Sequence, residues 1–289
     1  MKTHSIKLSI AQIKPEPSDL KHNLKQHLRY IKTAKKEGSG LVIFPELSLT
    51  GYFLKDSIYD VAINLKDESK NIIHDLLPES NNISVIAGFV EVDDDYNFYN
   101  SSLCMSGGRI LNVHRKVYLP TYGMFEEMRY FKAGNGFNVF GISGITSAIL
   151  TCEDAWHLSS SYIAVNKGAK LIIINSASPA RGIESGSEKF SSIEMWERLL
   201  SVIAFYYKSY VIYANRVGFE DGIGFAGGSC IFSPDGNKEY HLEYLDEGLL
   251  SAKLNISLLK NERFKTPLLR DENLSLTVKE LESIISTKN

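Results

Sequence analysis

The chain has 289 residues, which is long enough to bury a substantial core. Hydrophobic residues make up 44% and charged residues 23%, as in ordinary globular proteins. Because 32 Lys and Arg residues nearly balance 34 Asp and Glu residues, the net charge of −2 gives no reason to expect a nucleic-acid or membrane partner.

The first half of the chain alternates strand and helix patterns. We predict strands over 6–13, 41–46 and 83–92, a helix from Ser18 to a stop at Gly38, and a hairpin over 100–119 that turns at Gly107 and Gly108. The segments 41–46 and 83–92 are continuous apolar runs, which are typical of strands buried on both faces. Such strands indicate a sheet covered on both sides.

The second half repeats this rhythm. We predict strands over 147–152, 170–178, 209–218 and 247–256, helices over 153–168 and 188–208, a hairpin over 228–242, and a tail from about residue 260. No linker or low-complexity segment interrupts the pattern, so residues 1–289 are expected to form one domain. The mixture of buried strands, helices and hairpins predicts a layered α/β protein with mixed sheets.

Three polar side chains stand where predicted strands end. Glu46 closes one strand, Lys116 lies where "ILNVHRK" runs into "VYLP" near the end of the first hairpin, and Cys152 closes "SAILTC". Each alone has an ordinary interpretation as a solvated acid, a surface lysine or a small core residue. In α/β folds ligands gather beyond the carboxyl ends of strands, and a base, a cation and a nucleophile are what acyl transfer requires.

Other chemistries find little support in the sequence. It contains no GxSxG, HExxH, GxGxxG or phosphate-loop lysine motif, and its seven histidines are scattered, so we expect no metal and no cofactor. Three widely spaced cysteines without a CxxC pair indicate a reducing compartment. The polar N-terminus resembles no signal peptide, and no apolar run approaches a membrane span. We therefore expect a cytoplasmic protein.

Four segments together resemble the nitrilase superfamily of carbon–nitrogen hydrolases. They are "LVIFPELSLTGY", "HRKVYLPTYGMFEEMRYFKAG", "LTCEDAW" and "GGSCIFSPDG", in the family's order, and the resemblance runs from about residue 6 to about residue 255. It implies a four-layer αββα sandwich with two mixed sheets. It also implies a homodimer or a higher homo-oligomer. The wording of the middle segments is most similar to the glutaminase domains of glutamine-dependent NAD synthetases, here expected without an ATP-binding synthetase domain.

The resemblance also implies roles for particular residues. The family uses a Glu-Lys-Cys triad, which falls on Glu46, Lys116 and Cys152, and a second glutamate. Both Glu126 and Glu127 are candidates for that second glutamate, and the register of "EEMRYF" favours Glu127. Tyr52, in "LTGY", matches a position that lines the family's pocket.

The implied reaction is hydrolysis of the C–N bond of a small linear amide through a thioester on Cys152. Lys116 and the backbone N–H of Glu153 would stabilise the oxyanion. The Glu153 side chain need not face the sulfur, because neighbouring strand residues point to opposite faces. Asn175 and Ser178 follow the next strand and either bind substrate or form a turn.

Several alternative functions stay open. Within the class of carbon–nitrogen hydrolases they are a nitrilase, an N-carbamoyl amine or β-amino acid amidohydrolase, and a stand-alone glutaminase. Outside that class, the protein could be an inactive binding or regulatory homologue.

Overall fold

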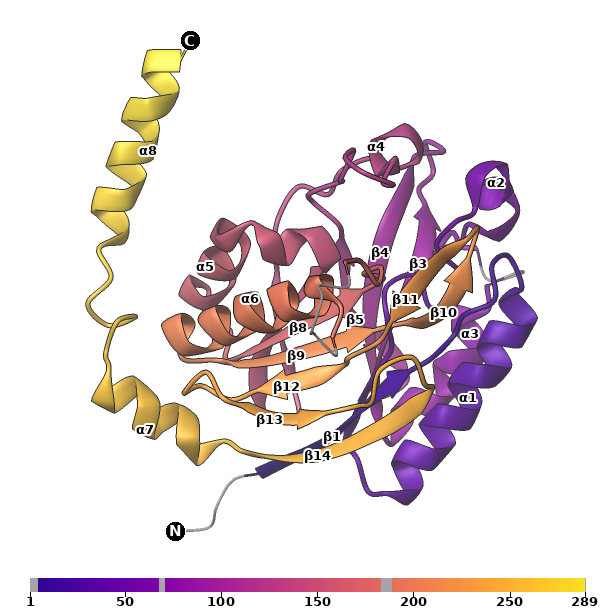
Figure 1. Ribbon diagram of the computed structural model, residues 1–289, viewed down its shortest axis with the longest axis horizontal. Helices are drawn as coiled ribbons and strands as arrows, with labels where there is room; N and C mark the ends of the chain where they lie inside the picture. The colour runs from indigo at the N-terminus through magenta and orange to yellow at the C-terminus, as the bar shows by residue number, and fades with distance from the viewer. Residues whose placement is uncertain (1–4, 68–70, 183–188, 289) are drawn as a thin grey trace.

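The computed structural model describes residues 5–67, 71–182 and 189–288 and contains two six-stranded mixed sheets (Figure 1). The first sheet has the order β14-β1-β2-β3-β4-β5, formed by Gly248–Asn255, Ser5–Gln12, Leu41–Ile43, Ser84–Val92, Phe98–Ser106 and Arg109–Arg115. The second has the order β13-β12-β9-β8-β7-β6, formed by Lys238–His241, Cys230–Phe232, Tyr210–Asn215, Leu171–Ser176, Ile145–Thr151 and Val139–Ile142. A separate hairpin joins β10 (Val217–Glu220) and β11 (Ile223–Ala226).

Both sheets share one internal pattern. Three parallel strands lie at the centre, β1-β2-β3 in the first sheet and β7-β8-β9 in the second. Antiparallel strands flank them on both sides: β14 and the β4-β5 hairpin in one sheet, β6 and the β12-β13 hairpin in the other. The alternation of strands and helices that the sequence repeats in its two halves therefore corresponds to two sheets of the same strand pattern, and we call each sheet with its helices a half-fold.

The two sheets pack face to face around one apolar core. Alternate residues of β1 and β2, such as Leu8 and Ile43, meet alternate residues of β8 and β9, such as Ile173 and Ile212, and all four are inaccessible to solvent. This period of two follows from the pleat of a strand, which turns every second side chain to the same face. The opposite faces of both sheets are apolar as well and need covering.

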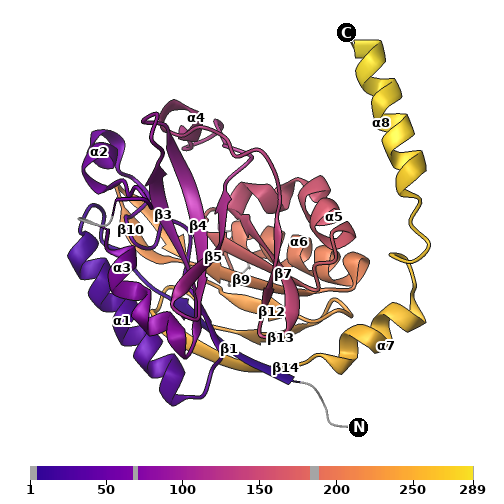
Figure 2. The same ribbon diagram turned by 180° about the vertical axis from the view of Figure 1, so that it is seen from behind.

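Helices supply those outer layers. α1 (Leu20–Lys36) and α3 (Ile73–Leu76) cover the first sheet, and α5 (Leu158–Asn166) and α6 (Ser191–Tyr207) cover the second (Figures 1 and 2). The predicted αββα sandwich is thus confirmed. The predicted helix over 153–168 is divided into a 3₁₀ turn, Cys152–Trp156, and α5. Residue 188, the first of the next predicted helix, lies outside the described residues.

The remaining elements are short or peripheral. They are α2 (Ile58–Val61), α4 (Glu127–Tyr130), the 3₁₀ turns Lys55–Ser57 and Pro78–Asn81, α7 (Ser257–Lys265) and α8 (Leu274–Lys288). The predicted tail is therefore helical, and α8 stands away from the sandwich with no buried side chain (Figure 1). Among the residues described, none of the helices has both the length and the apolar character to cross a bilayer.

Candidate active site

Cys152 sits at a sharp turn where β7 ends. The strand stops at Thr151, and Cys152 opens the 3₁₀ turn with a φ of 45°, in the left-handed region that a side chain rarely adopts. The residue is buried, and the hydroxyl of Ser176 donates to its sulfur over 3.4 Å. Ser176 in turn accepts from the Tyr213 hydroxyl at 3.3 Å. The turn thus places the thiol beside the carboxyl end of β8.

Glu46 lies beyond the end of β2 and is inaccessible to solvent. Its carboxylate accepts from three donors: Lys116 Nζ at 2.8 Å, Asn100 Nδ2 at 2.7 Å and the backbone N–H of Ala177 at 2.7 Å. These donors come from both sheets. They fix the carboxylate at the junction between the two halves of the fold.

Lys116 follows β5 and is also fully buried. Its ammonium donates to Glu46 at 2.8 Å and to Glu127 at 2.7 Å. Burial alone would lower the pKa of Lys116, but the charges of Glu127 and Glu46 raise that pKa well above its usual value. Lys116 is therefore a permanent positive charge inside the site.

Glu126 and Glu127, the two candidates for the second glutamate, have different surroundings. The side chain of Glu126 is 67% exposed and faces Arg129, whereas that of Glu127 is 4% exposed and binds Lys116. Burial raises the pKa of Glu127 to about 7, with Lys116 opposing the shift. The Tyr52 hydroxyl donates to the same carboxylate. The other oxygen of Glu127, Oε2, is buried without a partner in the described structure.

Asp154, which the sequence analysis did not select, ties the Cys152 turn to the Lys116 segment. One oxygen accepts from the Thr151 N–H at 3.0 Å and contacts His114 Nε2 at 2.7 Å. The other accepts from the backbone N–H groups of Val117 and Tyr118, both at 3.0 Å. Thr151 and Asp154 form a capping box, and the T-x-x-D spacing of "TCED" is a signal that could have found Asp154.

The other predicted residues lie at different places. Cys152 and Glu153 line the same pocket, which we call the thiol pocket, and Ser178 lines it too. The Glu153 carboxylate accepts from the Tyr122 hydroxyl at 2.8 Å rather than contacting the sulfur. Asn175 points between the sheets, where its amide donates to the carbonyl of Phe44, so it supports the chain before Glu46 and does not contact Cys152.

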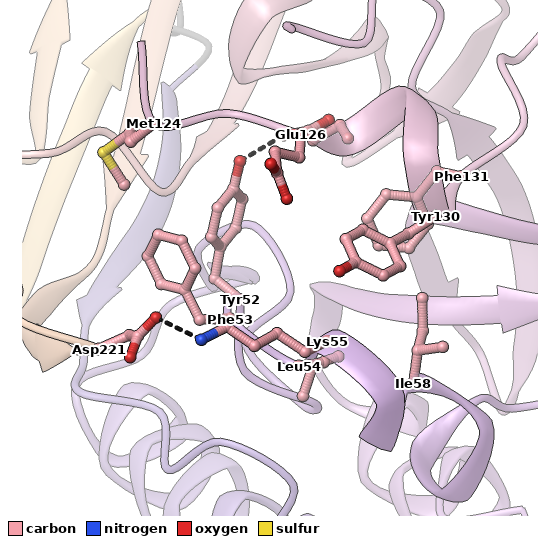
Figure 3. A pocket seen from close by; sticks show the side chains of 11 residues that line it. Tyr52, Phe53, Leu54, Lys55, Ile58, Met124, Glu126, Tyr130, Phe131 and Asp221 are labelled. Atoms are coloured by element: carbon pink, nitrogen blue, oxygen red, sulfur yellow. Dashed lines mark hydrogen bonds and ion pairs between the residues drawn. The ribbon is translucent and has the colours of Figure 1, made fainter. Parts of the chain in front are cut away.

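A second pocket opens on the other side of Glu127. Its lining includes Tyr52, Phe53, Ile58, Glu127 and Tyr130, with the Lys55–Asp221 ion pair at one side (Figure 3). Cys152 does not line it. The lining of this second pocket combines aromatic, aliphatic and charged side chains, and among the described residues it shares none with the thiol pocket.

The electrostatics decide how the thiol can react. Burial and the negative charge of Glu46 raise the pKa of Cys152 well above its usual value, and Lys116 offsets only part of this rise. The thiol is therefore protonated before substrate binds. A carboxylate that can take this proton and an ammonium that can receive negative charge both lie beside it. The fold and the site together define a class: αββα-sandwich proteins with a thiol, a carboxylate and an ammonium buried together at one end of the sheets.

Comparisons with known proteins show which family has this fold and these residues. The family model described as carbon-nitrogen hydrolase matches residues 7–263. Glutamine-dependent NAD(+) synthetase of Thermotoga maritima is 30% identical over 255 residues, which are 87% of this chain and 42% of that protein. Citrullinase of Francisella tularensis is 25% identical over 280 residues, 94% of this chain and 96% of that one. The crystal structure of a Helicobacter pylori carbon-nitrogen hydrolase, 24% identical, covers 96% of this chain and 99% of its own with a TM-score of 0.85.

The chain belongs to the carbon–nitrogen hydrolase family, within the nitrilase superfamily. It spans less than half the length of the synthetase that it resembles. The likeness to the Helicobacter pylori structure supports the fold.

Proposed function

We propose that the protein hydrolyses the C–N bond of a small linear amide through a thioester on Cys152. The observation that carries this proposal is the buried row Glu46–Lys116–Glu127 beside the thiol of Cys152, which lines the thiol pocket. Burying an ammonium and two carboxylates is costly, and removing them often stabilises a protein. A chemical role explains why the fold holds them together.

The reaction would begin with Glu46 as the general base. It takes the thiol proton while sulfur attacks the carbonyl carbon. Lys116 and the backbone N–H of Glu153 receive the negative charge that develops on oxygen. The C–N bond then breaks, and Glu46 returns the proton to the leaving nitrogen. A water molecule, deprotonated by Glu46, attacks the thioester and releases the acid and the free thiol.

Glu127 would act on the nitrogen side of the substrate. One of its oxygens holds Lys116, and the other is buried and unpartnered in the described structure, which suits an N–H donor of the substrate amide. No step requires a metal ion or an organic cofactor. The partner in this reaction is a small molecule.

Two narrower substrates are favoured by the relatives. The name of the Thermotoga maritima protein says that it depends on glutamine, an amide, and the citrullinase name specifies citrulline, a ureide. The same thiol, base and ammonium serve both, since amide and ureide each present a carbonyl carbon bonded to nitrogen. Glutaminase and carbamoyl-amine hydrolase activities are therefore the second candidates.

Ammonia release from a panel of linear amides, glutamine, carbamoylated amines and a nitrile tests the proposal. We expect turnover of at least one amide or ureide and, under rapid quench, a mass increase on the peptide that carries Cys152. The adduct would identify the acyl group. Absence of turnover across the whole panel would favour the binding or regulatory alternative.

We further propose that the protein assembles with a second copy of itself. Exposed apolar side chains lie on α5 and α6, namely Leu158, Ile163, Val202, Phe205 and Tyr206.

Helix α8 leaves the body beside α5, where the Tyr162 hydroxyl contacts the Thr277 hydroxyl at 3.4 Å. Its exposed residues Leu274, Val278, Leu281 and Ile285 are spaced four, three and four positions apart and form one apolar stripe. A 15-residue helix is marginal alone in water, so this stripe needs a partner surface.

Leu281→Glu is expected to weaken self-association at least about tenfold, because it places a charge in the apolar stripe of α8. Ser283→Glu, which adds the same charge on the opposite face of α8, is the matched control and should leave the dimer intact. Native mass spectrometry and sedimentation measure both. A wild-type protein that stays monomeric at micromolar concentration would contradict the assembly.

A further inference from the structure

Arg216 and Glu220 form a buried ion pair that takes no part in the reaction steps given above. Arg216 follows β9, Glu220 ends β10, and their side chains are 0% and 1% exposed. The Arg216 Nη1 donates to Glu220 Oε1, and Nη2 donates to the carbonyl of Pro15 at 3.4 Å. Burying both charges is costly, so an ion pair kept inside the fold calls for an explanation.

The backbone around this pair is fixed where the hairpin β10–β11 meets the end of β1. The Val217 N–H donates to the carbonyl of Ile13 at 3.0 Å. The Gly227 N–H donates to the carbonyl of Arg216, also at 3.0 Å. The guanidinium of Arg216 lies over the Phe225 ring, 4.3 Å from its centre, in a cation–π contact. The direction of the guanidinium is therefore set by contacts inside the protein.

The second oxygen of Glu220 holds the chain at Tyr52. Oε2 accepts from the backbone N–H of Tyr52 at 3.2 Å and from that of Phe53 at 3.0 Å. Gly51, directly before them, has a φ of 87°, and a Cβ added there would lie 2.5 Å from Pro17 Cα. The chain thus turns tightly at this point. Two charge-assisted hydrogen bonds from one carboxylate fix the backbone from which the Tyr52 side chain extends.

The ring of Tyr52 rests on the same hairpin. Its centre lies 6.3 Å from the centre of the Phe225 ring, at an interplanar angle of 65°, which is an edge-to-face arrangement. Phe225 therefore contacts both the Arg216 guanidinium and the Tyr52 ring. The buried ion pair and its aromatic neighbour hold Tyr52 at its backbone and at its side chain.

The Tyr52 hydroxyl, held in this way, contacts Glu127. It donates to Oε1, the oxygen that also accepts from Lys116. Oε2 has no partner in the described structure. Because both donors bind the same oxygen, the carboxylate is held with Oε2 free for the substrate. Displacing the hydroxyl would remove one of the two donors and let the carboxylate turn about its terminal bond.

We propose that the Arg216–Glu220 pair is a positioning device for Glu127, which acts through Tyr52 and keeps Oε2 available to the substrate amide. This inference rests on the role that the proposed function gives to Glu127. Among the described residues, the pair lines neither the thiol pocket nor the second pocket, so both members are positioning residues. A pair that only held the hairpin would affect stability and leave Glu127 unchanged.

The titration of Glu127 reports the position of the Tyr52 hydroxyl. Burial raises the pKa of Glu127 to about 7, Lys116 opposes this rise and Glu46 adds to it. The hydrogen bond from Tyr52 lowers the same pKa, because it favours the ionised carboxylate. Losing that hydrogen bond should therefore raise the pKa further. Other titratable side chains near Glu127 in the described structure are Cys152, Lys55, Glu126, Tyr130 and Asp221.

Glu220→Asp tests the proposal, because it keeps the charge beside Arg216 and shortens the reach to the Tyr52 backbone. Carbon-13 NMR of protein labelled at the glutamate side-chain carboxyls measures the titration of Glu127, and Glu127→Gln protein assigns the signal. We expect a pKa of about 7 in wild-type protein. In Glu220→Asp it should lie about one unit higher, the usual effect of losing a hydrogen bond to a charged group. The measurement needs no turnover.

Tyr52→Phe removes the hydroxyl itself and gives the reference shift. Since Glu220 acts through that hydroxyl, the double variant Tyr52→Phe/Glu220→Asp should raise the pKa of Glu127 no further than Tyr52→Phe alone. Additive shifts, or wild-type titration in Glu220→Asp, would overturn the proposal. Phe225→Leu removes the ring beside Tyr52 without changing a charge, and it takes the place of Glu220→Asp in this cycle if that variant does not fold.

Asp221→Asn is the matched control. Asp221 follows Glu220 in the same hairpin, but it pairs with the Lys55 ammonium at 2.7 Å on the surface (Figure 3). Exposed charges are screened, so the pKa of Glu127 should stay within about 0.3 units of the wild-type value. A rise as large as that in Glu220→Asp would show that any disturbance of the hairpin has this effect, and would contradict the assignment.

Activity separates this proposal from the proposed function. If ionised Glu127 binds the substrate amide, the rise of kcat/KM with pH should move upward by the same unit in Glu220→Asp. A shifted titration in a protein that hydrolyses no amide would support the positioning role and contradict the proposed function. Unchanged titration in a protein that hydrolyses amides would support the proposed function and contradict the positioning role.

Discussion

Replacing Cys152 by alanine is expected to reduce turnover of every amide or ureide substrate by at least about 10³-fold, since no thioester can form without the sulfur. The Cβ atom and the strained φ of 45° are common to both residues, so the turn should keep its shape. Circular dichroism and thermal melting should show a folded protein. Steady-state ammonia release measures the loss.

Cys104→Ala provides the matched control. Cys104 is also a free and fully buried cysteine, but it lies within β4, in the apolar core between the sheets. Its removal takes away a similar volume without touching Glu46 or Lys116. Cys104→Ala should retain activity, and Cys152→Ala protein with wild-type activity would exclude the thioester mechanism.

Lys116→Met is expected to affect both catalysis and stability. The oxyanion would lose its positive partner, which costs at least about 10²–10³ in kcat. Glu46 and Glu127 would also be left buried without the ammonium that lies 2.8 and 2.7 Å from them. Breaking a buried ion pair from one side typically costs about 3–5 kcal/mol of the free energy of unfolding. Denaturant unfolding measures this second effect.

The double variant Lys116→Met/Glu127→Gln separates the two effects. It removes one carboxylate charge together with the ammonium, so much of the lost stability should return. Activity should not return, because no positive charge faces the oxyanion. Recovery of turnover in the double variant would show that Lys116 serves only to hold Glu127.

Much of the fold could be predicted because its signals are local. The buried strands appear as continuous apolar runs, and the period of two in β1 places alternate residues in the core between the sheets. Glu46, Lys116 and Cys152 could be selected as candidates because they follow strands whose carboxyl ends meet. The register of a short motif was enough to favour Glu127 over Glu126, and burial separates the two.

The hydrogen bonds around these three candidates were harder to predict because they join distant segments of the chain. Asn100 reaches Glu46 across 54 positions, and Asp154 reaches Val117 across 37. Neither pair has a pattern within one window of sequence. Ser176 was passed over for its neighbour Asn175, because the strand pleat decides which of the two faces the sulfur, and that phase is set by packing.

The pairing of β14 with β1 has a consequence for synthesis of the chain. β1 is Ser5–Gln12 and β14 is Gly248–Asn255, so the strand that covers one side of β1 is translated more than 200 residues later. Until then β1 presents a free row of backbone hydrogen-bonding groups, which other chains can pair with. The half-fold that starts first is thus completed last, and its closure is a long-range and slow step in folding.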